Sequence, residues 1–126
     1  MQEQLILFET AKLAKEKGFK VNNSEDFYFY NEKHYPEYPR RFEYLRVGYD
    51  DDLIAPTQSL LQKWLREKHN IIVISDLVTG FSDSTYSWNI YTKNNIWSLT
   101  GFTAKVYDSY EEALEAGLLE ALKLIK

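Results

Sequence analysis

The chain has 126 residues, of which 44% are hydrophobic and 27% charged, with five glycines and three prolines. This length predicts a single domain over residues 1–126, and this composition excludes a disordered or collagen-like chain. Because there is no cysteine, the chain has no disulfide, thiolate metal site or thiol nucleophile. The formal net charge of −4 disfavours a nucleic-acid binder, which usually carries a basic excess or a concentrated basic face.

Hydropathy predicts no membrane span. The longest apolar runs, Leu5–Phe8 and Ile71–Ile74, have about four residues each, far below the roughly 20 that cross a bilayer. The first residues lack the basic region and apolar core of a secretory signal. We therefore expect a cytoplasmic protein with no membrane partner.

The first predicted element is a helix near the N-terminus. Apolar or small residues recur there at helical spacing, at Leu7, Ala11, Ala14 and Gly18. Gly18 can adopt the left-handed conformation that ends a helix, and the following Phe19 can fold back on the last turn.

Two aromatic-rich strands are predicted next, at Phe27–Tyr30 and Phe42–Tyr49. Between them, Asn31–Arg41 contains Pro36 and Pro39. Proline lacks a backbone donor and favours an extended residue before it, so we expect this segment to be a loop.

A second helix is predicted after a solvated turn at Asp50–Asp52. Pro56 prevents the helix from starting earlier, Thr57 is a suitable N-cap and Asn70 a suitable end. One face of this helix is apolar and should pack inward; it contains Leu60, Leu61, Trp64 and Leu65. The other face is polar and should be solvated; it contains Gln58, Gln62, Lys63, Arg66 and Glu67.

Three further strands are predicted, at Ile71–Ser75, Thr85–Thr92 and Ile96–Phe102. The first is apolar at consecutive positions, which is typical of a strand buried on both faces. The second alternates and places one set of residues on the same side, namely Tyr86, Trp88 and Ile90. Asn94-Asn95 predicts a turn because Asn tolerates positive φ, and a short extended piece is expected through Ala104–Tyr107.

The last predicted element is a helix that begins near Ser109. Ser109 and Glu112 have the spacing of a capping box, in which each side chain bonds the backbone N–H of the other residue. A continuous apolar stripe follows at helical spacing, made of Tyr110, Leu114, Gly117, Leu118, Ala121, Leu122 and Ile125. The position of Gly117 on this stripe predicts a close approach of another element to the helix backbone.

Together these elements predict an α+β fold of two layers. The expected architecture is an antiparallel or mixed sheet of about five strands covered by three helices, in the order α-β-β-α-β-β-β-α.

Three blocks of the chain carry a resemblance. They are FETAKLAKEKGF at residues 8–19, APTQSLLQKWLREKHN at 55–70 and YEEALE at 110–115. These blocks resemble recurring blocks in a family of small uncharacterised proteins of phages and gut bacteria. The resemblance implies a mobile-element context, and the family brings no known activity, cofactor or site residue.

No motif in the sequence predicts catalysis or metal binding. His34, His69 and the acids Asp50–Asp52 lack the spacing of zinc or calcium ligands. The segment Thr79–Asp83 is not the G-x-S-x-G elbow of a serine hydrolase, and the dispersed glycines form no phosphate-binding loop. We therefore predict no catalytic, cofactor-binding or metal-binding residue.

The one compositional anomaly is the aromatic content of 16%, with ten tyrosines. Tyrosine and arginine are interleaved in one region, which defines a candidate interaction surface of Tyr28, Tyr30, Tyr35, Tyr38, Arg40 and Arg41. Three interpretations are open: packing of large side chains in core and loop, recognition of a protein partner, or a platform for single-stranded nucleic acid. The nearby acids Glu32, Glu37 and Glu43 would repel phosphate, which disfavours the third.

The first functional hypothesis is therefore a small non-enzymatic interaction domain that acts through protein contacts or self-association, with no cofactor. The alternative is a nucleic-acid-binding accessory protein, and the third is an enzyme of unknown class.

Overall fold

The computed structural model describes residues 4–20, 28–31, 35–41, 52–78 and 85–126, and the side chains of residues 4–20, 55–78 and 85–126. The predicted strand Phe42–Tyr49, together with His34, Asp50 and Asp51, lies outside the described residues.

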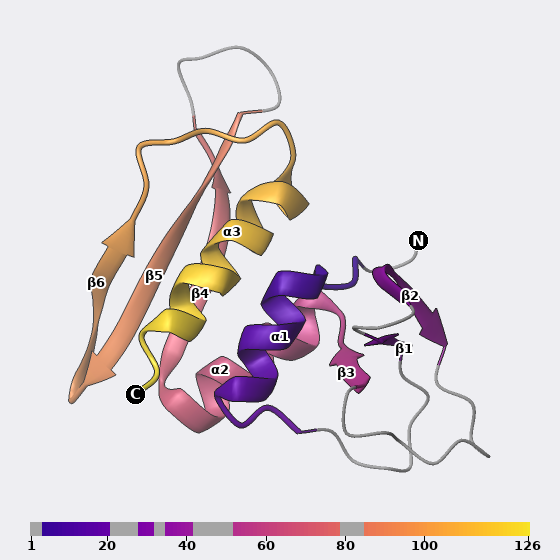
Figure 1. The fold of residues 1–126 in the computed structure, drawn as a ribbon. Helices are drawn as coiled ribbons and strands as arrows, with labels where there is room; N and C mark the ends of the chain where they lie inside the picture. Colours follow the sequence, from indigo (N-terminus) through magenta and orange to yellow (C-terminus); the bar gives the residue numbers. More distant parts are fainter. Residues whose placement is uncertain (1–3, 21–27, 32–34, 42–51, 79–84) are drawn as a thin grey trace.

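The described residues form an α+β fold with three helices and six strands (Figure 1). In chain order the elements are α1 (Phe8–Glu16), β1 (Tyr28–Asn31), β2 (Tyr35–Arg41), β3 (Asp52–Ala55), α2 (Gln58–His69), β4 (Ile71–Leu77), β5 (Tyr86–Asn94), β6 (Ile96–Phe102) and α3 (Tyr110–Lys123). The strands make two antiparallel sheets of three strands each, ordered β2-β1-β3 and β4-β5-β6. The α+β class is thus confirmed, whereas a single sheet of about five strands in the predicted element order is wrong.

Strand β2 contradicts the prediction of a loop at Asn31–Arg41. It pairs with β1 at both ends. Between its paired residues Tyr35 and Arg40, however, β2 advances by five residues while β1 advances by only two. Pro36 and Pro39 lie in this irregular stretch of an edge strand. Proline is tolerated there because no regular ladder requires its missing N–H. Asp52, expected in a solvated turn, is instead the first residue of β3 and pairs with Asn31.

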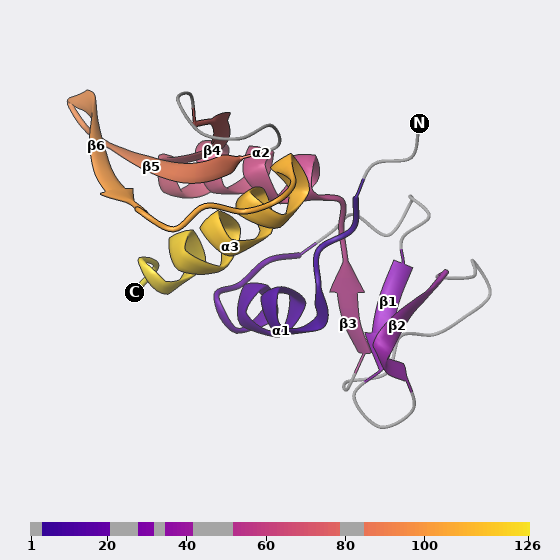
Figure 2. The ribbon, with the colours of Figure 1, turned by 90° about the horizontal axis from the view of Figure 1, so that it is seen from above.

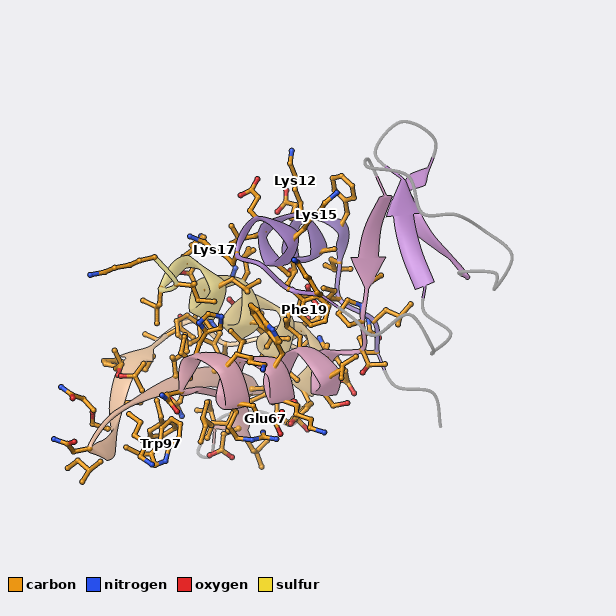
Figure 3. The ribbon with its side chains drawn as sticks, turned by 90° about the horizontal axis from the view of Figure 1, so that it is seen from below. Lys12, Lys15, Lys17, Phe19, Glu67 and Trp97 are labelled. Atoms are coloured by element: carbon orange, nitrogen blue, oxygen red, sulfur yellow. The ribbon has the colours of Figure 1, made fainter. Side chains whose placement is uncertain are left out.

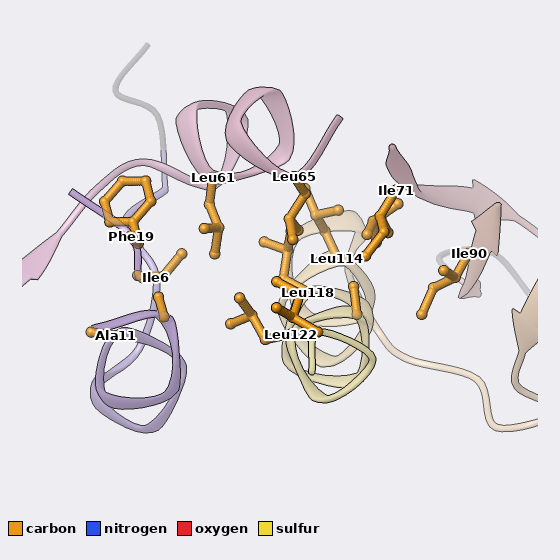
Figure 4. Close-up of a cluster of buried hydrophobic side chains, with 14 of the residues drawn as sticks. Ile6, Ala11, Phe19, Leu61, Leu65, Ile71, Ile90, Leu114, Leu118 and Leu122 are labelled. Carbon is orange, nitrogen blue, oxygen red and sulfur yellow. The ribbon is translucent and has the colours of Figure 1, made fainter. Parts of the chain in front are cut away.

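Helix α3 occupies the centre of the molecule. Its side toward the sheet contacts β4 and β5, and its opposite side contacts α1 (Figure 2). Helix α2 contacts both α3 and β4 and lies beside the β4 edge of the sheet. Figure 4 shows the α3 leucines packed below the side chains of α2 and next to those of β4 and β5. As predicted, four residues of α3 are at most 2% exposed, namely Leu114, Leu118, Ala121 and Leu122.

Gly117 makes the predicted close approach. A Cβ at this position would lie 2.8 Å from Cβ of Trp88 and 2.9 Å from Cγ1 of Val73. Both neighbours belong to the sheet, so the missing side chain of Gly117 allows β4 and β5 to rest directly against the α3 backbone.

The local start and stop signals are confirmed, except that only one half of the predicted capping box is formed among the described residues, from Glu112 N to the Ser109 side chain. Thr57 Oγ1 accepts a hydrogen bond from Leu60 N at 3.2 Å, and Ser109 Oγ accepts one from Glu112 N at 3.1 Å. The predicted ends and turn have positive φ, at Gly18 (96°), Asn70 (55°) and Asn95 (74°). Each cap satisfies an N–H that a helix leaves unpaired at its first turn.

The predicted burial differs from the observed burial at four places. Tyr110, predicted on the apolar stripe of α3, is 43% exposed. Leu7 is 55% exposed, and Thr10 takes its place on the buried side of α1. Gln58 is 4% exposed, although the polar face of α2 was expected to be solvated. Strand β4 is not buried on both faces, because its buried residues alternate with half-buried ones.

Replacing Gly117 with Ala should lower the free energy of unfolding by about 1–3 kcal/mol. The gain in helix propensity of roughly 1 kcal/mol is outweighed by forcing Trp88 and Val73 off the helix. Gly101→Ala is the matched control, since its Cβ would meet Ile90 at an ordinary 3.6 Å. Urea unfolding should show a lower midpoint for Gly117→Ala only; equal midpoints would contradict the close packing.

Leu118→Ala should cost about 2–5 kcal/mol, because it leaves a cavity at a fully buried position. Ser109→Ala, in the same helix, should cost only about 1 kcal/mol through loss of the cap. Chemical denaturation of both variants measures the difference, and an unchanged midpoint for Leu118→Ala would mean that this face of α3 is not packed.

Candidate functional site

The most connected polar group in the described structure is the carboxylate of Glu115 on α3, which is 9% exposed. One oxygen, Oε2, accepts hydrogen bonds from the backbone N of Leu7 at 2.9 Å and from Thr10 Oγ1. The other, Oε1, accepts one from Gln58 Nε2 at 3.1 Å, and the same amide also donates to the carbonyl of Glu111 at 2.9 Å. The carboxylate therefore joins α3 to the first turns of α1 and α2.

A cleft of about 750 Å³ lies beside this group, between the start of α1, residues 105–108 and α3. Its apolar walls include Leu7, Phe8 and Leu119, and its charged lining consists of Glu9, Lys105, Asp108, Glu112 and Glu115.

The cleft offers little chemistry. Thr10 also lines the cleft, but it is 2% exposed and its hydroxyl already bonds Glu115, so this pair links α1 to α3. His69 is not in the lining; it ends α2 and stacks edge-on against Trp64 at a centroid distance of 4.6 Å. Within the described ranges, no three carboxylate or imidazole groups are placed to hold a metal ion.

A second feature is the face of the β4–β5–β6 sheet that points away from α3, called here the outer face. Residues that alternate with the buried Val73 and Ile90 belong to it. The register sets them in cross-strand rows, which are Ile72–Tyr91–Leu99, Ile74–Asn89–Phe102, Lys93–Trp97 and Asp76–Ser87.

The β6 part of the outer face is apolar and open. Phe102 is 68% exposed, Leu99 52% and Trp97 39%. Figure 3 shows the Trp97 side chain on the side of the sheet opposite to α3 and α1. Among the described elements, all three helices lie elsewhere, since α3 covers the inner face at β4 and β5 and α2 lies along β4.

The two edges of this sheet also differ. At β4, the α2 side chain Gln62 donates from Nε2 to the carbonyl of Val73 at 2.8 Å and so occupies the edge. At β6, the strand Ile96–Phe102 contains no charged residue and no proline, the usual devices that protect an edge strand.

The predicted Tyr/Arg surface is described only as backbone. Tyr28 and Tyr30 lie on β1, and the other four residues lie on β2. The register places Tyr28 opposite Arg41 and Phe29 opposite Arg40, so the two strands bring aromatic and cationic residues next to one another.

The outer face was missed by the sequence reasoning. The sequence predicts a strand at Ile96–Phe102, but the apolar residues of this strand do not alternate, so the pattern does not indicate an exposed side. The available signal was the lack of charge in this segment, which is unusual for a strand at a sheet edge.

Comparison with family models, curated proteins and solved structures found no match to this chain. Within the part of the chain that the structure describes, no helix has the length and apolarity needed to cross a membrane.

Glu115→Ala should lower the free energy of unfolding by about 2–4 kcal/mol, because it leaves the N–H of Leu7, the hydroxyl of Thr10 and the amide of Gln58 without their acceptor. Glu120→Ala is the control on the same helix, as its exposed pair with Lys123 should contribute less than about 0.5 kcal/mol. Guanidinium unfolding compares the two. Similar losses for both would show that Glu115 is not the link between the helices.

Proposed function

We propose that this protein is a small non-enzymatic interaction domain of the cytoplasm, which binds a protein partner through the outer face of the β4–β5–β6 sheet. The observation that carries the proposal is the row of exposed apolar side chains on β6. Scattered exposed apolar residues are ordinary on a protein surface, whereas a contiguous group on one uncovered face is typical of an interaction site.

The chemistry of the outer face favours protein over nucleic acid. Its charges are Asp76 and Lys93, which balance one another, so it lacks the basic excess that binds phosphate. Trp97 and Phe102 are aromatic residues of the kind enriched at the centres of protein interfaces. The Glu115 cleft supports an enzymatic function less well, because its most buried carboxylate is occupied by internal hydrogen bonds.

Two further parts of the proposal rest on the sequence. The Tyr/Arg surface at Tyr28–Arg41 is proposed as a second contact region, supported by the pairing of β1 with β2. The mobile-element context is proposed from the resemblance of residues 8–19, 55–70 and 110–115 to proteins of phages and gut bacteria.

Site-specific photo-crosslinking in cells tests the proposed face. A photoreactive amino acid at Leu99 should give a defined protein adduct, identified by mass spectrometry, because Leu99 lies in one of the two middle rows of the outer face. The same group at Lys12, which is exposed on α1 on the other side of α3 (Figure 3), should give none. No adduct at Leu99, or equal adducts at both positions, would overturn the proposal.

Fluorescence anisotropy with labelled DNA and RNA tests the alternative function. We expect no binding at low salt. Affinity that falls steeply as salt rises would instead indicate phosphate contacts and would favour a nucleic-acid accessory protein.

A further inference from the structure

We propose that the occupant of the outer face is a second copy of this chain, packed face to face on it about a two-fold axis. This inference rests on the proposed function, because it names the partner of that same face. In the dimer, two three-stranded sheets would form a sandwich, with α3 of each copy on the outside.

The shape of the outer face fits this arrangement. Two sheets pack face to face about 10 Å apart when each offers an apolar side, and their strands then run within about 30° of one another. The outer face offers such a side, because its middle rows, Ile72–Tyr91–Leu99 and Ile74–Asn89–Phe102, contain no charged residue. A two-fold axis through these rows would bring the apolar side chains of the two copies together in one layer.

The two charges of the outer face are opposite in sign and stand at opposite ends, so the face is complementary to a second copy of itself. Asp76 pairs in register with Ser87 at one end of the sheet, and Lys93 pairs with Trp97 at the other end. On β5 these rows are six positions apart, from Ser87 to Lys93, which is about 20 Å along the strand.

A two-fold axis that lies between the sheets and perpendicular to the strands exchanges the two ends. Asp76 of each copy would then lie over the end of the sheet that holds Lys93 of the other copy. The arrangement creates two opposite-charge contacts and no like-charge contact. A second copy therefore matches the charge pattern of this face, although the whole chain carries a net charge of −4.

The size of the face predicts a weak dimer. Three strands about 4.8 Å apart and about 20 Å long present roughly 300 Å² of flat sheet. Standard protein interfaces bury about 800 Å² on each partner. We therefore expect reversible association with a dissociation constant in the micromolar range or weaker, and not a permanent dimer.

Sedimentation equilibrium over a concentration series, up to about 1 mM, tests the proposal with the full chain. The wild type should sediment as monomer and dimer in exchange. Leu99→Lys, which places a charge in the apolar layer, should weaken the dimer at least about tenfold. Leu124→Lys is the matched control, because Leu124 is 45% exposed just beyond the end of α3 and does not belong to the outer face; it should leave dimerisation unchanged.

A charge exchange tests the two-fold geometry without disturbing the apolar layer. Asp76→Lys and Lys93→Asp should each weaken the dimer several-fold, and the double variant should restore it to near the wild-type value, since opposite charges again meet. Circular dichroism confirms that each variant is folded, and both positions are exposed.

The outcomes separate this inference from the proposed function. A wild type that stays monomeric at every concentration overturns self-association, and a dimer that ignores the charge exchange overturns this face-to-face geometry. If the chain stays monomeric while the Leu99 adduct in cells contains a different protein, self-association is wrong and the proposed function stands. If Leu99 gives no adduct in cells and the chain is monomeric, both are wrong.

Discussion

The three helices meet at one buried carboxylate, and the arrangement of the rest of the chain depends on it. Glu115 accepts hydrogen bonds at the first turns of α1 and α2, where the helix dipoles present partial positive charge. The backbone brings these two starts together, because Leu5 forms a bridge with Thr57 and Gln58 N donates to the carbonyl of Gln4 at 2.8 Å. Donors from two helix ends thus replace the water that a buried carboxylate loses, and no cation is needed. The carboxylate thus fixes the starts of α1 and α2 beside the same stretch of α3.

The positions of the three helices explain why the outer face of the β4–β5–β6 sheet is left open. Helix α3 has the sheet against Gly117 on one side and α1 on the opposite side, while α2 contacts α3 from the β4 edge of the sheet. All three helices therefore lie on the inner side of the β4–β5–β6 sheet or along its β4 edge. The described part of the chain contains no further helix that could cover the outer face. An α+β domain of this size can satisfy its core and still leave the second face of its sheet for contact with another molecule.

The parts of the fold that the sequence predicts are those decided by neighbouring residues. Caps at Thr57 and Ser109, and left-handed residues at Gly18 and Asn70, follow from chemistry within one or two turns. The buried position of Gln58 does not, because its partner Glu115 is 57 residues away in the chain. From its polarity alone, Gln58 is predicted on the solvated face of α2. It is buried because α1, α2 and α3, which are far apart in the sequence, meet at this point. The same holds for β2, whose prolines are acceptable only because the strand lies at a sheet edge.

The outer face was hidden from sequence reasoning by a single irregularity in β6. Leu99 and Phe102 are three residues apart, and in a regular strand they would point to opposite faces. The register of β5 with β6 shifts between Ile90 and Tyr91, so that Thr100 has no partner in the ladder. This extra residue returns Phe102 to the same side as Leu99, opposite Asn89. Aromatic content directed attention to the tyrosines of β1 and β2, but composition does not distinguish an aromatic residue in a core from one in an open row. The extra residue in β6, a β-bulge, decides this point. Without it, either Leu99 or Phe102 would lie on the side of α3, and the outer face would lose its continuous apolar row.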